Sequence, residues 1–551
     1  MFKRSLAPAL LLSTAVFAPL ATFAQDTTPN KWGAHIDLEG KLGDDRDIGE
    51  VDLFIPLSQD DDTLLFSTLR GRIDNQDSEE GNFGLGLRQM MSNGWNIGGY
   101  GYFDRRNTGF DNSFNQITLG AEALSETFDL RANVYMPISD KTKSAPGAGS
   151  ADFAGAGISV RPGQEKALKG FDAEIGWRAP VFDLEGNKHL RLYAGGYHFY
   201  TSGVEDVTGP RARAELVFTE IKQLWSGSRL SLNAEFQHDD PRGSQGFISA
   251  RLRIPLQKES RNLAKLSYME QRMVDPIVRD VDIVSQAGAF GAAETVTQTA
   301  DGKTLTVIDN GTVTGATLAT EVTNAGDNAA IILNGNYTGI NDHIVVRQGQ
   351  SIYGGATVAV KLADGSTEYI KTPSATLSGT GGNGSMGGPR RILQMADNSR
   401  LEGATLNLTN TASSTGVYIN EVDNAKVINN TINVESTTAT ASGIQLSSGA
   451  FADRPMNTEI RNNQISTTAS SAGSYSRSIV LIHNENTIIS GNQITSEALS
   501  GSTREDLIFI NGDTVNISGS GNSGNISSCR HASGTITGSV GFTTATDNDC
   551  P

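Results

Sequence analysis

Apolar and polar side chains alternate along three stretches between Gly94 and Ile138, each about ten residues long. In the last of them Phe128 and Leu130 alternate with Asp129 and Arg131. A period of two indicates β-strands with one apolar and one polar face. Strands of this length joined by short polar turns are typical of membrane-spanning barrels, whereas soluble sandwiches use strands of about five or six residues. The pattern predicts a transmembrane β-barrel.

The same alternation extends from Trp32 to Leu256, where thirteen candidate strands can be counted. The segment Ala151–Val160, rich in alanine and glycine, is the weakest, and closed bacterial barrels have an even number of strands. We therefore expect about twelve. The polar faces carry charged residues, namely Arg131, Arg178, Arg191, Arg211, Arg213, Arg251, Glu174, Glu215 and Glu235. Because charges are costly against hydrocarbon, these faces are expected to line the lumen.

All four tryptophans, Trp32, Trp95, Trp177 and Trp225, lie at or near these strands. Such positions are expected for an aromatic girdle at the membrane interface. Ordinary core tryptophans are the alternative.

The N-terminus carries Lys3 and Arg4, then an apolar core over residues 6–20 that ends shortly before Ala24. This is the pattern of a secretory signal peptide over residues 1–24. A transmembrane helix is the alternative, but the core is short and contains Pro8 and Pro19. No other stretch approaches the ~20 apolar residues that a spanning helix needs. The chain is thus expected to be exported, with the barrel over residues 25–258.

Composition narrows the function classes. The 551 residues include 44 basic and 61 acidic side chains, which gives a net charge of −17. A basic footprint for nucleic acid is therefore absent. The two cysteines, Cys529 and Cys550, predict a structural disulfide in an oxidising compartment, worth roughly 3 kcal/mol, with free thiols as the alternative.

The alternation breaks in residues 259–303, where a short helix is expected to end before Pro276. An even number of strands returns the chain to its starting side, so the C-terminal half either stays on that side or threads back through the pore. The segment after Pro276 mixes apolar residues with opposite charges. Residues predicted to lie in a charged lumen are Arg272, Val278, Arg279, Asp280 and Asp282. A periplasmic linker is the alternative.

A self-similar unit recurs in residues 304–551. The nonapeptides that begin at Asn424, Asn457 and Asn486 align, and a looser copy begins at Asp513, with spacings of 33, 29 and 27 residues. A second apolar strand precedes each copy. Short strands, Asn-rich turns and this period predict a parallel β-helix solenoid of about ten coils, favoured over bacterial immunoglobulin-like domains. Residues predicted to stack as an asparagine ladder are Asn430, Asn463 and Asn492.

Motifs for catalysis are scarce. Neither a P-loop nor a His-Glu-x-x-His zinc motif occurs. Asp423 and Glu485 occupy equivalent positions in the repeat and are the best candidates for an acid/base pair, but Met456 interrupts them and solvated turn residues are the simpler interpretation. We expect no catalytic residue, metal or cofactor.

The barrel half resembles the β-domain of the intimin/invasin family, the inverse autotransporters. The resemblance rests on residues 98–104, 119–123, 130–135, 272–274 and 278–284 and covers residues 30–285, about half of the chain. It implies a twelve-stranded barrel in the outer membrane of a Gram-negative-type cell, a linker through the pore, and a C-terminal passenger displayed outside. The passenger resembles the right-handed parallel β-helix repeat instead of immunoglobulin-like tandem domains. Only about seven residues separate the signal from Trp32, so no peptidoglycan-binding module is expected before the barrel.

The resemblance also implies function and partners. We expect an adhesin, with outer-membrane lipid, the barrel-assembly machinery, periplasmic chaperones and an unknown surface ligand (protein or glycan) as partners. Two alternatives remain: a surface-anchored enzyme acting on polysaccharide, and a periplasmic structural module beneath a pore.

Overall fold

The computed structural model describes residues 31–153, 157–221, 224, 227–256, 266–280, 282–383, 388–448, 453–499, 504–525 and 529–542. The predicted signal peptide, Trp225 and Cys550 lie outside these ranges. None of the described helices has the length and hydropathy to cross a membrane.

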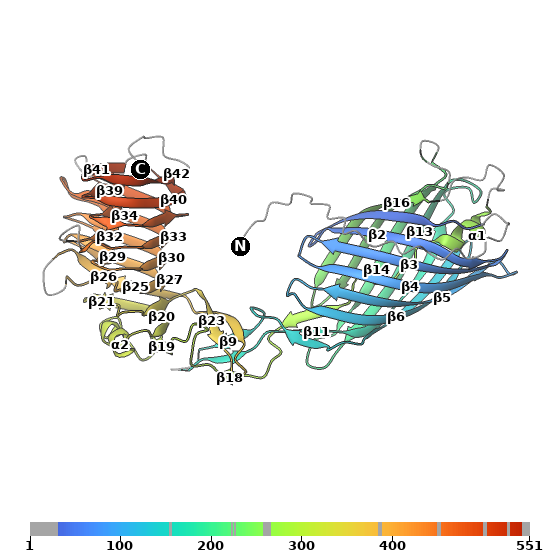
Figure 1. The fold of residues 1–551 in the computed structure, drawn as a ribbon, viewed down its shortest axis with the longest axis horizontal. Helices are drawn as coiled ribbons and strands as arrows, with labels where there is room; N and C mark the ends of the chain where they lie inside the picture. Colours follow the sequence, from blue (N-terminus) through green and yellow to red (C-terminus); the bar gives the residue numbers. More distant parts are fainter. Residues whose placement is uncertain are drawn as a thin grey trace.

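Twelve antiparallel strands close into a barrel, in which β1 pairs with β16 (Figure 1). The strands are β1 (His35–Gly43), β2 (Ile48–Gln59), β3 (Thr63–Asp74), β4 (Glu79–Met90), β5 (Asn96–Asn107), β6 (Ser113–Leu124), β7 (Phe128–Pro137), β12 (Lys169–Ala179), β13 (Lys188–Tyr200), β14 (Val207–Thr219), β15 (Arg229–Asp239) and β16 (Gly243–Pro255). The expected number is confirmed. The thirteenth candidate, residues 151–160, belongs to the loop between β7 and β12, where β9 (Ser150–Asp152) and β10 (Ser159–Arg161) have three residues each, too short to span a membrane.

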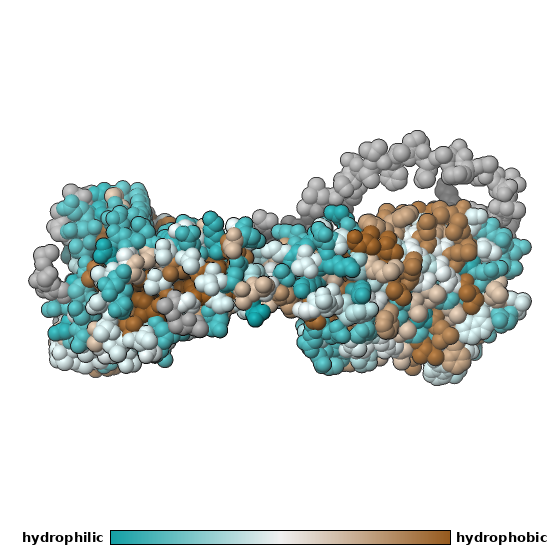
Figure 2. Space-filling model, turned by 90° about the horizontal axis from the view of Figure 1, so that it is seen from below, coloured by the Kyte–Doolittle hydropathy of each residue, from teal (hydrophilic) through white to brown (hydrophobic). Residues whose placement is uncertain are grey.

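The two faces of the strands separate as the alternation predicts. On β7, Leu130 and Val134 are exposed outside, whereas Asp129 and Arg131 are buried inside. Figure 2 shows the hydrophobic residues gathered on the barrel surface and hydrophilic ones towards its ends. The barrel therefore has the apolar exterior and charged lumen of a membrane protein.

The prediction of a tryptophan girdle is only partly confirmed. Trp177 is exposed on the outer surface, but Trp32 is 1% exposed and packs inside one end of the barrel. Trp32 precedes the first strand, so it is free to fold into the lumen instead of facing lipid.

The C-terminal half is a stack of parallel coils (Figure 1). One parallel sheet contains β21 (Ile344–Val345), β26 (Arg390–Gln394), β29 (Ser414–Asn420), β32 (Ala441–Ser447), β35 (Tyr475–Leu481), β39 (Arg504–Asn511) and β41 (Cys529–Ser533). Parallel partners β25 (Ala375–Gly379), β28 (Thr405–Asn410), β31 (Thr431–Ser436), β34 (Gln464–Ala469) and β38 (Gln493–Ala498) form a second face. A third face contains β19 (Leu305–Asp309), β20 (Ala330–Ile340), β22 (Ser351–Tyr353), β27 (Arg400–Glu402), β30 (Lys426–Ile428), β33 (Glu459–Arg461), β36 (Asn484–Glu485), β37 (Ile488–Ser490), β40 (Thr514–Gly524) and β42 (Ile536–Phe542).

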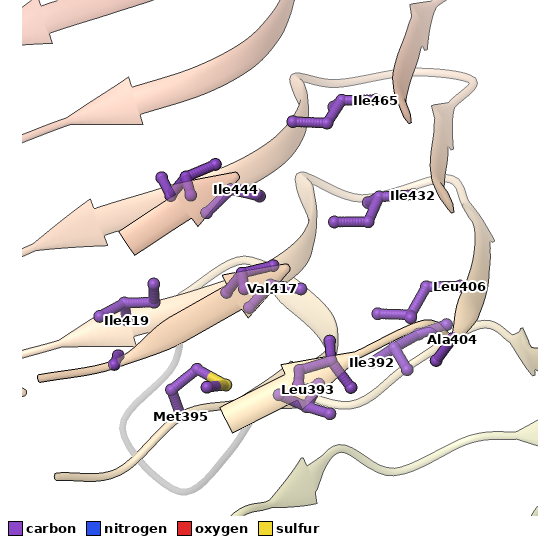
Figure 3. Close-up of a cluster of buried hydrophobic side chains, with 14 of the residues drawn as sticks. Ile392, Leu393, Met395, Ala404, Leu406, Val417, Ile419, Ile432, Ile444 and Ile465 are labelled. Carbon is purple, nitrogen blue, oxygen red and sulfur yellow. The ribbon is translucent and has the colours of Figure 1, made fainter. Parts of the chain in front are cut away.

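Apolar side chains from all three faces fill the interior of this rod. Ile432 and Ile465 are register partners, and Ile444 approaches them from another sheet (Figure 3). The described strands of these faces pair in parallel, as the repeat predicts, whereas the β-helix and its right-handedness stay predictions. Among the described residues, the sheet that begins with β21 has seven strands and the face that begins with β19 stacks nine, from β19 to β42, so the expected ten coils stay a prediction. Residues between Thr304 and Leu408 also form a helix, α2 (Leu318–Asn324), and a hairpin, β23 (Thr357–Lys361) with β24 (Thr367–Lys371).

The remaining short elements belong to the linker and to one barrel loop. The linker begins with α1 (Tyr268–Gln271) and the 3₁₀ helix η1 (Arg272–Val274), and it later forms β17 (Ser285–Gly288) and β18 (Glu294–Thr295). The loop between β7 and β12 contributes β8 (Thr142–Ser144), β9 (Ser150–Asp152), β10 (Ser159–Arg161) and β11 (Gln164–Ala167).

Candidate functional site: the linker in the barrel lumen

The linker enters the lumen at the end where β1 begins and β16 ends. A capping box between Ser267 and Glu270 starts α1. The Trp32 indole donates to the Glu270 carbonyl at 2.8 Å. Met273, fully buried, packs against Trp32, Phe54 and Phe66. This apolar cluster fills the lumen at the end that holds both barrel termini.

Arg272 fixes the first turn of the linker to the barrel wall. Its guanidinium donates to both carboxylate oxygens of Asp129, at 2.7 and 2.8 Å, and to Asp275 at 2.9 Å. Asp275 in turn pairs with Arg229 of β15 at 2.5 Å. From β4, Arg88 donates to the Met273 and Asp275 carbonyls at 2.8 and 2.7 Å. Side chains and backbone of the linker are therefore both bound by inward-facing charges.

The extended segment after Pro276 continues in the same way. The Val278 carbonyl accepts a hydrogen bond from Asn133 at 3.2 Å. Arg279 pairs with Asp104 of β5 at 3.0 Å. Asp280 pairs with Arg211 of β14 at 2.7 Å, and its backbone N–H donates to the Tyr135 hydroxyl at 2.6 Å.

Asp282 meets a cluster of arginines at the opposite end of the barrel. It forms ion pairs with Arg46 and Arg72, and Arg106 lies 3.9 Å away. Arg106 also donates to the Ile283 carbonyl at 2.7 Å. Beyond this point β17 pairs antiparallel with β11 of the long loop. The chain has crossed from one end of the barrel to the other.

Breaking one of these buried pairs costs more than the pair contributes net, because a buried charge without its partner keeps the full desolvation penalty. The order of charges along the linker, Arg272, Asp275, Arg279, Asp280 and Asp282, therefore specifies one register of linker against wall. The space left beside Pro276–Arg279 is a cavity of about 70 Å³ lined mainly by charged side chains.

The structure places all five predicted lumen residues inside the barrel. Sequence reasoning missed Asp275 and the wall partners Arg46, Arg72 and Arg88. Strand alternation gives the signal for Arg72 and Arg88, since both lie on inward positions of regular strands. Arg46 lies in the turn between β1 and β2 and has no such signal.

The three predicted ladder asparagines stack in the rod. The Asn430 amide donates to Asn463 and the Asn463 amide to Asn492, each at 3.0 Å, and all three are buried. A fourth member, Asn522, accepts from Asn492 at 3.0 Å. Sequence alignment missed it because it matched Asp513 to Asn486, whereas the side chain that bonds to Asn486 is Asn516, three residues later.

The other candidates from the sequence are the disulfide and the carboxylate pair of the repeat. Cys529 is disulfide-bonded; its pairing with Cys550, which lies outside the described residues, stays a prediction. Met456 forms a parallel bridge to both Asp423 and Glu485, and Glu485 pairs with Arg454. The two carboxylates are thus separated by an apolar residue instead of facing each other. Among the described residues there is no group of three side chains suited to bind a metal.

Several solved structures are similar to part of this chain. A membrane protein from work on in-meso crystallization has 16% identity, covering 46% of this chain and 99% of that one, with a TM-score of 0.34. The KdgM porin in complex with disordered oligogalacturonate has 9% identity, with coverages of 40% and 99% and a TM-score of 0.25. Outer membrane phospholipase A from Escherichia coli has 9% identity, with coverages of 42% and 94% and a TM-score of 0.26.

The search of curated proteins found no match. Residues 26–205 match the sequence model of the inverse autotransporter β-domain. Together with the closed barrel and its apolar exterior, this match identifies an outer-membrane protein. Residues 26–205 of this chain are thus similar to the inverse autotransporter β-domain.

Proposed function

We propose that the barrel anchors the chain in the outer membrane and that the linker carries the rod through the lumen to the cell surface, where the rod acts as an adhesin. The observation that supports display is the course of residues 272–283, which contact the wall from the end holding both barrel termini to the opposite end. With the barrel termini in the periplasm, the rod lies outside.

An adhesive role fits the rod's construction. A stack of parallel coils is a stiff spacer that presents a long polar surface around an interior of apolar side chains and an asparagine ladder. The ligand is a protein or glycan on another surface. Insertion of the barrel uses the barrel-assembly machinery and periplasmic chaperones.

The orientation is tested with an impermeant maleimide on intact cells. Asp364 lies at the exposed tip of the β23–β24 hairpin. Asp61 lies in the exposed turn between β2 and β3, at the end of the barrel remote from the rod. The two test variants are Asp364→Cys and Asp61→Cys. We expect Asp364→Cys to be labelled on intact cells and Asp61→Cys only after permeabilisation. The reverse pattern would refute surface display.

Adhesion is tested separately. Cells with the full chain should be retained on the target surface, and cells with a chain that lacks residues 375–542 should not, although their barrel is inserted equally. Equal retention of both kinds of cell would show that the rod is not the adhesive part.

A further inference from the structure

The longest connection between barrel strands is the loop of residues 138–168, at the end where the linker leaves the lumen. Two of its strands pair antiparallel with the emerging linker, β11 with β17 and β10 with β18. Single backbone bonds extend this contact: Leu168 donates to the Val284 carbonyl at 2.9 Å, and Val296 donates to the Ile158 carbonyl at 3.0 Å. The linker is therefore bound along the loop as soon as it leaves the pore.

The same loop shares an apolar core with the rod. This joint core contains Ile158 and Val160 from β10 and its flank, Val296 from the linker, Val307 and Ile332 from the first rod strands, and Val358, Val360, Leu362 and Ile370 from the β23–β24 hairpin and its flank. Val160 is fully buried there. In Figure 1, β9, β18 and β23 lie together between barrel and rod. Three distant segments of chain thus form one small domain.

A buried carboxylate fastens the hairpin to the loop. Glu368 of β24 is 1% exposed, and its two oxygens accept the backbone N–H groups of Gly147 at 2.5 Å and Gly163 at 2.6 Å. A buried charge without hydrogen-bond donors is strongly unfavourable, so Glu368 favours the docked arrangement. At Gly163 a Cβ would lie 2.1 Å from the Ala145 carbonyl oxygen. The loop backbone can therefore approach closely enough only with glycine at that position.

We propose that strands β8–β11 form a docking platform on which the rod begins to fold. This inference rests on the proposed display function, because it requires the linker to emerge at residue 284. Residues 285–371 leave the pore first and complete the joint core with contacts close to the exit. Each later coil then pairs in parallel with an edge already formed, as β27 does with β22 and β30 with β27.

The platform addresses a physical problem of the rod. A single coil cannot bury its apolar face alone. Parallel pairing between distant segments is also slow to start, because the chain loses loop-closure entropy before the contacts form. A preformed surface on the barrel supplies the first partner and ties the first coil to a fixed point. Stacking of the remaining coils outside the membrane then opposes return of the chain through the pore.

The test uses the full chain in cells, with Val160→Asp compared with Ser159→Asp, the same substitution on the exposed neighbour in β10. After a pulse of synthesis, external protease is added at intervals, and the time for the rod to become resistant is measured. Burial of an unpaired charge in the joint core should slow that step by roughly tenfold or more in Val160→Asp. Ser159→Asp should stay within about twofold of the wild type, because its side chain faces solvent.

A second pair keeps the barrel sequence unchanged. Glu368→Gln places an amide NH₂ against a backbone N–H donor, so we expect a slowing of about tenfold, while Glu497→Gln on the exposed face of β38 has no effect. Barrel insertion is followed in parallel by the heat-dependent shift of the folded barrel in SDS gels. If Val160→Asp loses that shift, its barrel has not folded, and the kinetics of Glu368→Gln then test the platform.

The outcomes separate the two proposals. Wild-type kinetics in both Val160→Asp and Glu368→Gln, with normal display, would overturn the platform and leave display intact. A wild-type rod that protease never reaches on intact cells, but cleaves in permeabilised cells before resistance develops, would refute display itself.

Discussion

Replacement of Arg272 by glutamine removes the ion pair that fixes the start of the linker. The Arg272 side chain is 4% exposed and donates two hydrogen bonds to Asp129, one to Asp275 and one, at 2.6 Å, to the Ser125 carbonyl. Glutamine is shorter and neutral, so it cannot replace this set. Loss of one partner from a buried pair costs about 3–5 kcal/mol.

The cost here is smaller because both carboxylates keep a second partner. Asp129 retains Arg191 at 2.9 Å, and Asp275 retains Arg229 at 2.5 Å. We therefore expect Arg272→Gln to weaken the binding of the linker to the wall by about 2–3 kcal/mol. This corresponds to a roughly 30- to 150-fold larger population of molecules in which the start of the linker is detached from the wall.

Conductance of the purified protein in planar bilayers measures that population. The wild type should be closed almost continuously, and Arg272→Gln should open in brief events with a correspondingly higher total open time. Arg347→Gln is the matched control, since Arg347 lies on the rod and pairs with Asp327 with its side chain 43% exposed. A closed Arg272→Gln protein, with the thermal stability of the wild type, would refute the assignment of Arg272 as the anchor of the linker.

Three further predictions concern the rod. Asn463→Ala breaks the ladder and leaves backbone groups on both sides unsatisfied, so the rod should lose about 2–4 kcal/mol in urea unfolding. The exposed Asn433→Ala should change it little, and equal losses would contradict the ladder's role. Burial raises the pKa of Tyr337 from 10.0 to about 12, so stability is full below pH 10 and falls as pH rises towards 12. Tyr337→Phe should abolish that fall in unfolding titrations, and an unchanged slope would exclude this residue. Thiol titration in denaturant should find no free thiol in the wild type and one in Cys550→Ser; a free thiol in the wild type would rule out the Cys529–Cys550 bridge.

The barrel was predictable because a period of two fixes which face of a strand meets lipid. On β5, Asn96 and Asp104 are buried and Ile97 and Phe103 are exposed, as the alternation requires. Membrane strands show this pattern because a charge on the lipid face is penalised, most strongly near the middle of the bilayer. Trp32 escaped the rule because it precedes the regular pattern, and its surroundings depend on a helix more than 200 residues later.

The rod was predictable where its coils are uniform. Asn430, Asn463 and Asn492 recur in equal local sequences, whereas Asn522 comes after a stretch of different sequence and needs the backbone register to be recognised. The joint had no comparable signal. The strands that the loop, the linker and the hairpin contribute to the joint core are two to five residues long, and Glu368 is an ordinary hairpin residue until the loop of a distant domain folds over it.

The most direct test of display through the lumen is protease accessibility on intact cells, with epitope tags after Gln25 and before Pro551. We predict that external protease removes the C-terminal tag while the N-terminal tag stays protected until the outer membrane is permeabilised. A C-terminal tag that is cut only after permeabilisation would contradict this prediction and place the rod in the periplasm.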